Sequence, residues 1–267
     1  MKILIVGDSF TYGHGCSDRN YWFSLKENRW FGENFNEFGM APPSQHCWAS
    51  LLAQHLPEFE VINLAVPGNN ATTMAIETLK KIDKNVKLVI FSGPPSARIE
   101  IVSHDGTEQN VISWLVTDNS INQERQTRNE TNHSPILEDV LNAKLAYMKY
   151  LHSDVVTANL AITAAHASCY AALNVGAHFL WSFPNTDVLI SDSRYEAELS
   201  GIRKYEIPSA NGFFNPWTLK GQPYFAEDGH INDLGHRTYF EQILLPRVEA
   251  TLWPSSSKVI IPGLRVV

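Results

Sequence analysis

The sequence predicts an α/β protein in which a mostly parallel sheet has helices on both faces. Short apolar, β-branched runs alternate along the chain with longer segments whose apolar residues recur at helical spacing. Such strand–helix alternation is typical of parallel sheets with covering helices. The 267 residues are 44% hydrophobic and 18% charged, which is a globular composition. A chain of this length can bury a large core without disulfides or a structural metal.

Four strands are expected, each followed by a turn or a break. Gly93-Pro94-Pro95 ends the third strand, and Pro184 ends the fourth, because proline cannot donate a ladder hydrogen bond. The four ranges are 2–6, 60–65, 86–92 and 178–183.

Helices are expected between these strands and after the last one. Pro57 follows the first helix, and Ser134-Pro135 is typical of an N-cap and first turn. Pro246 predicts a kink or break inside the last helix. The helical ranges are 45–56, 71–84, 135–151, 154–173 and 234–250.

Three stretches near 12–44, 100–133 and 184–228 do not follow the alternation. They are rich in Asn, Gly, Pro, Ser and aromatic residues, and we interpret them as long loop insertions in a single domain, 1–267. Aromatic residues between 21 and 48 are suited either to contact a substrate or to pack the loop itself. The polar stretch 100–133 is a candidate lid or assembly contact, so a homo-oligomer or another assembly partner stays open.

Charge and cysteine content exclude several classes of protein. The chain has 21 basic and 28 acidic residues, a net charge of −7, which argues against nucleic acid as a partner. It has no fully apolar run of 18 residues, so we expect no membrane span. The three cysteines suggest no disulfide framework, and the apolar run at 3–6 is too short for a signal peptide. We therefore expect a cytoplasmic protein where it is made; export by a non-Sec route, or a place in a larger particle, stays open.

Gly7-Asp8-Ser9-Phe10 directly follows the first strand and is the strongest chemical signal. A serine on a tight turn at a strand end is held above the sheet, where the next backbone N–H can face a developing oxyanion. A serine hydroxyl needs a base to become a nucleophile. The alternative interpretation of Ser9 is a helix N-cap or an ordinary turn residue. Cys16 lacks a local base, which favours a buried thiol over a nucleophile.

The second signal is the segment from Glu227 to His236, just before the last helix. An acid two or three residues before His230 can bond its Nδ1 and leave Nε2 as a general base. The acids and histidines of this segment match no standard metal spacing, so we expect no metal. We expect His236 to pack under the loop.

These motifs together resemble the SGNH (GDSL-type) hydrolase family. Ser9 matches the nucleophile of its first block, and Asn63–Asn70 resembles the second, which implies an oxyanion N–H from Gly68. Asp228 and His230 resemble the acid and base of the last block. The resemblance implies a flavodoxin-like three-layer α/β/α fold and ester hydrolysis through an acyl-serine, without a cofactor.

Two positions depart from the family pattern. The third block usually reads Gly-x-Asn-Asp, and its asparagine is an oxyanion donor, whereas this chain reads Gly93-Pro94-Pro95-Ser96. Asn69, Asn70 or Arg98 is a candidate substitute donor; Arg98 is also suited to bind a substrate carboxylate or to pair with Glu100.

The second departure concerns the acid, which in the family is commonly three residues before the histidine, where Glu227 stands. We favour Asp228, because the shorter Asp-x-His form also occurs in the family.

The sequence therefore predicts a serine esterase with Ser9, Asp228 and His230 as catalytic residues and Ser9, Gly68 and Asn70 around the oxyanion. The expected substrate is a small-molecule or carbohydrate ester, either short-chain or an O-acetyl group. Two alternatives stay open. One is a non-catalytic binding or structural module that retains the fold, and the other is an O-acyltransferase that uses the same residues.

Overall fold

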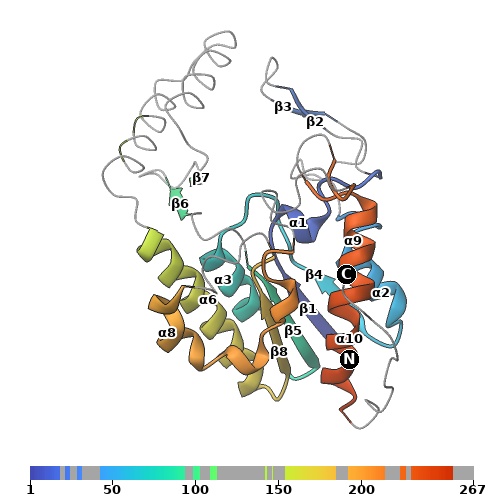
Figure 1. Ribbon diagram of the computed structural model, residues 1–267, viewed down its shortest axis with the longest axis vertical. Coiled ribbons are helices and arrows are strands. Elements are labelled where there is room, and N and C mark those ends of the chain that lie inside the picture. The colour runs from blue at the N-terminus through green and yellow to red at the C-terminus, as the bar shows by residue number, and fades with distance from the viewer. Residues whose placement is uncertain are drawn as a thin grey trace.

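A four-stranded parallel sheet forms the centre of the molecule (Figure 1). The computed structural model describes residues 1–18, 22–24, 29–31, 43–93, 99–102, 109–112, 142, 146, 154–184, 192–213, 223–226 and 230–254. The strands lie in the order β4 (Glu60–Asn63), β1 (Lys2–Val6), β5 (Val86–Ser92) and β8 (His178–Ser182). Numbered along the chain, this order is 2-1-3-4, which is the start of the flavodoxin-like doubly wound order.

Helices cover both faces of the sheet, so the predicted three-layer α/β/α fold is confirmed. Helices α3 (Ala71–Lys81) and α6 (Asp154–Asn174) lie on one face (Figure 1). Helices α2 (Trp48–His55), α9 (Asp233–Tyr239) and α10 (Leu245–Leu252) lie on the other.

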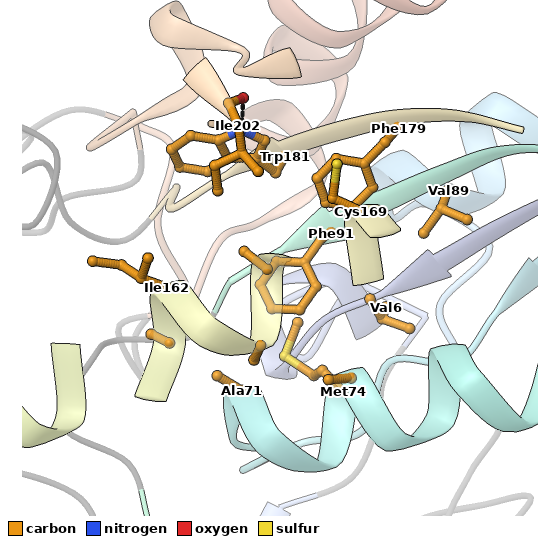
Figure 2. Close-up of a cluster of buried hydrophobic side chains, with 14 of the residues drawn as sticks. Val6, Ala71, Met74, Val89, Phe91, Ile162, Cys169, Phe179, Trp181 and Ile202 are labelled. Carbon is orange, nitrogen blue, oxygen red and sulfur yellow. Dashed lines mark hydrogen bonds between the residues drawn. The ribbon is translucent and has the colours of Figure 1, made fainter. Parts of the chain in front are cut away.

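The side chains of β1 alternate between two hydrophobic clusters, one on each side of the sheet. Leu4 and Val6 belong to the cluster under α3 and α6, and Ile3 and Ile5 belong to the cluster under α2 and α9. Figure 2 shows the first cluster, in which the buried indole of Trp181 donates to the Ile202 carbonyl at 2.7 Å. Because both of its faces are covered, β1 can be apolar at every position from Ile3 to Val6.

The last predicted helix is interrupted where Pro246 predicts a break. Helix α9 runs into a π-helical segment, η5 (Phe240–Leu244), before α10 begins at Leu245. Pro246 lies in the first turn of α10, where its missing N–H removes the least hydrogen bonding. The helix expected at 135–151 lies almost wholly outside the described residues.

Parts of the three irregular stretches are more regular than expected. Two antiparallel pairs are present, β2 (Trp22–Ser24) with β3 (Arg29–Phe31) and β6 (Ile99–Val102) with β7 (Gln109–Ile112).

The third stretch contains a run of short helices. They are η2 (Ser193–Tyr195), α8 (Glu196–Ser200), η3 (Arg203–Tyr205) and η4 (Pro208–Ala210). Tyr195, Leu199 and Ile202 from this run are buried in the first cluster. Their spacing of four and three residues is helical, but it extends over too few residues to predict a helix from the sequence.

Helix α6 packs on the sheet through small side chains. Ala158, Ala161, Ala165 and Ala172 are buried in the first cluster, and the helix contacts α3, β5 and β8. In the described part of the chain, this helix alone is long and apolar enough to cross a membrane by length and composition. In this fold it forms part of the layer that covers the sheet.

Candidate active site

Ser9 stands at the first position of a one-turn helix, α1 (Ser9–Tyr12), which begins two residues after β1 ends. The Asp8 carboxylate caps this helix by accepting from the Phe10 N–H at 3.1 Å. Gly7 makes the sharp turn possible, because a Cβ there would lie 2.1 Å from the Thr11 hydroxyl oxygen. The turn therefore fixes Ser9 at the carboxyl end of the central strand β1, as the sequence predicts.

The structure brings His230 to Ser9 across 221 positions of sequence. Its Nε2 lies 3.2 Å from the Ser9 Oγ, which is within hydrogen-bonding reach. Ser9 itself is only 3% exposed, and His230 is half-buried. A serine hydroxyl needs a contact of this kind with a base to act as a nucleophile.

A small hairpin-like loop holds His230. Phe225 and Ile231 form an antiparallel bridge, and the Ala226 N–H donates to the His230 carbonyl at 2.8 Å. Asn232 then caps α9 by accepting from the Gly235 N–H and donates from its amide to the Pro223 carbonyl at 2.8 Å. The histidine is thus anchored on both sides by backbone hydrogen bonds and by a helix cap.

The segment Gly13–Asp18, which follows the serine helix, packs against this histidine loop. The His14 ring stacks on the His230 ring, with 4.4 Å between centroids and 20° between planes. Gly15 touches the loop so closely that a Cβ there would lie 2.5 Å from the Ile231 carbonyl oxygen. Sequence reasoning missed both residues; two glycines flanking a histidine just after the serine motif were the available signal for a close approach.

The loop after β4 is tied to the residue just before the serine turn. The Val66 N–H and the Asn69 amide both donate to the Gly7 carbonyl, at 3.2 Å and 3.3 Å. Gly68 between them has a φ of +78°, a conformation that favours glycine. The predicted oxyanion segment therefore lies beside the carboxyl end of β1.

Asn70 is the N-cap of α3. Its Oδ1 accepts from the Thr73 N–H, and its Nδ2 donates to the Thr73 hydroxyl, each at 3.0 Å. One of its two amide hydrogens is therefore engaged with Thr73. The oxyanion role of Asn70 stays a prediction, as does that of Gly68.

Three predicted site residues lie outside the described residues. Asp228 and Glu227 are two of them, so the choice between these residues as the acid stays a prediction. Arg98 and residues 94–97, which follow Gly93 in place of the third family block, also lie outside.

His236 is fully buried in α9, next to the start of α2. Its Nδ1 accepts from the Trp48 N–H at 3.4 Å. Burial lowers the pKa of His236 from 6.5 to about 3, so the ring is neutral in the folded protein. As the pH falls, His236 therefore binds a proton in the unfolded chain before it does so in the folded protein. The contribution of His236 to the unfolding free energy is complete above pH 6.5 and is lost progressively between pH 6.5 and about 3.

The cysteines behave as buried apolar side chains. Cys16, Cys47 and Cys169 are all buried free thiols, and burial raises the pKa of each. Cys16 is therefore poorly suited to be a nucleophile, in line with the sequence interpretation. Within the described ranges, no group of three or more His, Cys, Asp or Glu side chains is placed to hold a metal ion.

Fold and site together define a doubly wound α/β protein with a serine–histidine pair at the carboxyl ends of its strands, where such folds bind ligands.

The sequence matches no family model and no curated protein. The solved structures to which it is similar at low identity include the following three. One is TesA, with 16% identity, a TM-score of 0.42 and coverage of 95% of this chain and 99% of that chain. Another is a member of the lipolytic protein G-D-S-L family from Veillonella parvula, with 12% identity, a TM-score of 0.42 and coverage of 90% and 94%. The third is phospholipase A1 from Streptomyces albidoflavus, with 11% identity, a TM-score of 0.40 and coverage of 94% and 98%. What this chain does is therefore inferred from Ser9, His230 and their surroundings.

Proposed function

We propose that this protein is an SGNH-type serine esterase that cleaves a carboxylic ester through an acyl-serine intermediate. The observation that carries the proposal is the 3.2 Å contact between His230 Nε2 and Ser9 Oγ, on a turn directly after the central strand. A base within hydrogen-bonding reach is what converts a serine hydroxyl into a nucleophile.

In the first half of the reaction, His230 Nε2 takes the hydroxyl proton while Ser9 Oγ attacks the ester carbonyl carbon. The carbonyl π electrons move to oxygen, where the N–H groups of Ser9 and Gly68 stabilise the charge. The tetrahedral intermediate then collapses, the bond to the alkoxy oxygen breaks, and His230 returns the proton to the leaving alcohol. An acyl group remains on Ser9.

In the second half, water replaces the alcohol. His230 takes a proton from water, and the resulting hydroxide attacks the acyl carbon. The bond to Ser9 Oγ then breaks, His230 returns the proton to Ser9 Oγ, and the carboxylic acid leaves. Asp228 is our preferred partner for His230 Nδ1, since it would hold the ring tautomer that leaves Nε2 free. This chemistry requires no cofactor.

For the substrate we propose a short-chain ester, with a carbohydrate O-acetyl ester as the preferred class. The proposal is motivated by the aromatic residues between positions 21 and 48. Trp48 is not among the candidate contacts, because it is 1% exposed and packs on Tyr239 with 5.9 Å between ring centroids. Of the other aromatic residues of that segment, Trp22, Phe23, Trp30 and Phe31 belong to β2 and β3, and the rest lie outside the described residues.

A fluorophosphonate probe and p-nitrophenyl acetate test the proposal. We expect an intact-mass adduct that maps to Ser9, and a fall in kcat of about 10³-fold or more in Ser9→Ala. The matched control is Ser200→Ala, at an exposed serine of α8, which should keep both activities. If the probe forms no adduct and Ser9→Ala hydrolyses the ester as fast as the wild type, the hydrolase proposal is wrong and a non-catalytic module is favoured.

Comparison of substrates separates the two finer proposals. An O-acetylated oligosaccharide should be deacetylated with a higher kcat/KM than p-nitrophenyl butyrate or longer acyl esters. A preference for long acyl chains would refute the carbohydrate ester as substrate while leaving the esterase proposal intact.

A further inference from the structure

Two rings from the serine turn contact the imidazole of His230. The His14 ring lies nearly parallel to it, at 4.4 Å between centroids and 20° between planes. The Phe10 ring is tilted by 43° at 5.5 Å. Both residues belong to the segment that carries or directly follows Ser9, so the nucleophile and the rings against its base move as one piece of chain.

A stacked neighbour matters for a histidine base because of where its lone pair lies. The Nε2 lone pair is in the plane of the imidazole, so the ring plane determines whether it faces the Ser9 hydroxyl. A single hydrogen bond at Nε2 leaves the ring free to tilt about that bond. A flat ring packed face to face restricts the tilt, at an energy typical of aromatic pairs.

The backbone that carries His14 is held on both sides. The Gly13 and His14 N–H groups both donate to the Ser9 carbonyl, at 3.1 Å and 3.0 Å. Farther along the segment, Ser17 donates to the Asp233 carboxylate from its N–H at 2.9 Å and from its hydroxyl at 2.5 Å. Asp233 begins α9, the helix that follows the histidine loop, so both ends of the Gly13–Asp18 segment are tied to the active-site elements.

We propose that His14 is a positioning residue whose ring holds the plane of the His230 imidazole toward Ser9. The proposal rests on the proposed esterase function. His14 moves no proton in this scheme and touches no substrate. It acts through the stacked face alone, so another flat ring should serve in its place and a non-aromatic polar side chain should not.

Two variants separate the ring from the polarity of the side chain. His14→Phe keeps a flat ring, and His14→Gln keeps a polar side chain without the ring. We expect His14→Gln to lower kcat for p-nitrophenyl acetate by roughly 2- to 10-fold with KM unchanged, and His14→Phe to stay within about twofold of the wild type. His178→Gln, at the exposed start of β8, is the matched control and should behave as the wild type.

A readout that does not need turnover comes from the ring signals of His230 in nuclear magnetic resonance spectra. In a Ser9→Ala background, a stacked ring should shift the His230 ring protons upfield. We expect this shift with His14 and with His14→Phe, and its loss in His14→Gln. An unchanged His230 signal in His14→Gln would show that the rings do not stack in solution and would overturn the proposal.

The outcomes distinguish this inference from the function on which it rests. If the wild type shows Ser9-dependent turnover and His14→Gln keeps its kcat, the positioning role is wrong and the esterase proposal stands. If His14→Phe loses as much activity as His14→Gln, a flat ring at this position is not sufficient, and the ring proposal is again overturned. If the wild type shows no Ser9-dependent turnover, the esterase proposal fails, and the positioning role falls with it whatever the spectra show.

Discussion

Replacing Gly15 with alanine should separate His230, the proposed base, from Ser9, the proposed nucleophile. A Cβ at this position would lie 2.5 Å from the Ile231 carbonyl oxygen and 2.9 Å from the carbonyl carbon and Cβ of His230. Two of these are backbone atoms, which cannot rotate away as a flexible side chain would. The Gly13–Asp18 segment and the histidine loop must therefore move apart by about 0.9 Å to restore an ordinary contact of 3.4 Å.

The distance from His230 Nε2 to Ser9 Oγ sets the size of the expected effect. At 3.2 Å the pair is already at the long end of hydrogen-bonding reach, so a further displacement of about 0.9 Å breaks the contact. A misplacement of about 1 Å in a catalytic group typically costs about 10²-fold in rate. We therefore expect Gly15→Ala to lower kcat by about 10²-fold, and the overpacked loop to lose about 1–3 kcal/mol of unfolding free energy.

The assay is p-nitrophenyl acetate hydrolysis together with the rate of fluorophosphonate labelling of Ser9, each corrected for the folded fraction from thermal unfolding. Gly201→Ala is the matched control, because its Cβ would meet only the edge of the His166 ring, at 3.1 Å, far from the site in the fold. A folded Gly15→Ala protein with wild-type kcat would refute the reasoning, and so would an equal loss in Gly201→Ala.

Three further predictions concern groups around the site. His236→Gln keeps an acceptor for the Trp48 N–H but removes a group whose pKa burial lowers to about 3. The fall in unfolding free energy with decreasing pH, measured by urea titration between about pH 6 and pH 4, should then be shallower by up to about 1.4 kcal/mol per pH unit. Asn70→Ser keeps a hydroxyl for the N-cap of α3 and removes the amide donor, so a fall in kcat of about 10²-fold or more with little loss of stability would support an oxyanion role. An unchanged kcat would leave Asn70 as a cap alone. Since burial raises the pKa of the Cys16 thiol, a thiol-specific reagent at about pH 8 should modify Cys16 only after unfolding, and rapid labelling of the folded protein would contradict this.

The fold could be predicted because its central strands are buried on both faces. Strands Lys2–Val6 and Val86–Ser92 form at the predicted positions around the apolar runs 3–6 and 88–91, since a strand between two helical layers needs no polar face. The short helices between residues 193 and 210 were not predicted. Each is under two turns long, and their periodic signal is shorter than the windows in which helical spacing is recognisable.

The candidate site was predictable only where chemistry depends on a local motif. Ser9 and His230 each lie in a recognisable short pattern, and the geometry of parallel sheets brings strand ends together. The two glycines that flank His14 indicate a close approach but not its partner, because the contacts of His14 and Gly15 depend on how two loops from opposite ends of the chain cross. The stacking of the His14 ring and the close approach at Gly15 can be recognised only when the position of the histidine loop is known.

The separation of 221 positions between Ser9 and His230 also has a consequence for biosynthesis. At a translation rate of about 5–20 residues per second, the ribosome makes the serine turn roughly 10 to 45 s before it makes the histidine. Strands β1, β4 and β5 can pair during that interval, because all three are complete by Ser92. The nascent chain would thus carry a formed nucleophile turn without its base. Fluorophosphonate labelling of Ser9 would then begin only once the histidine loop has been made and has folded against the serine turn, so the labelling would measure when the fold is complete.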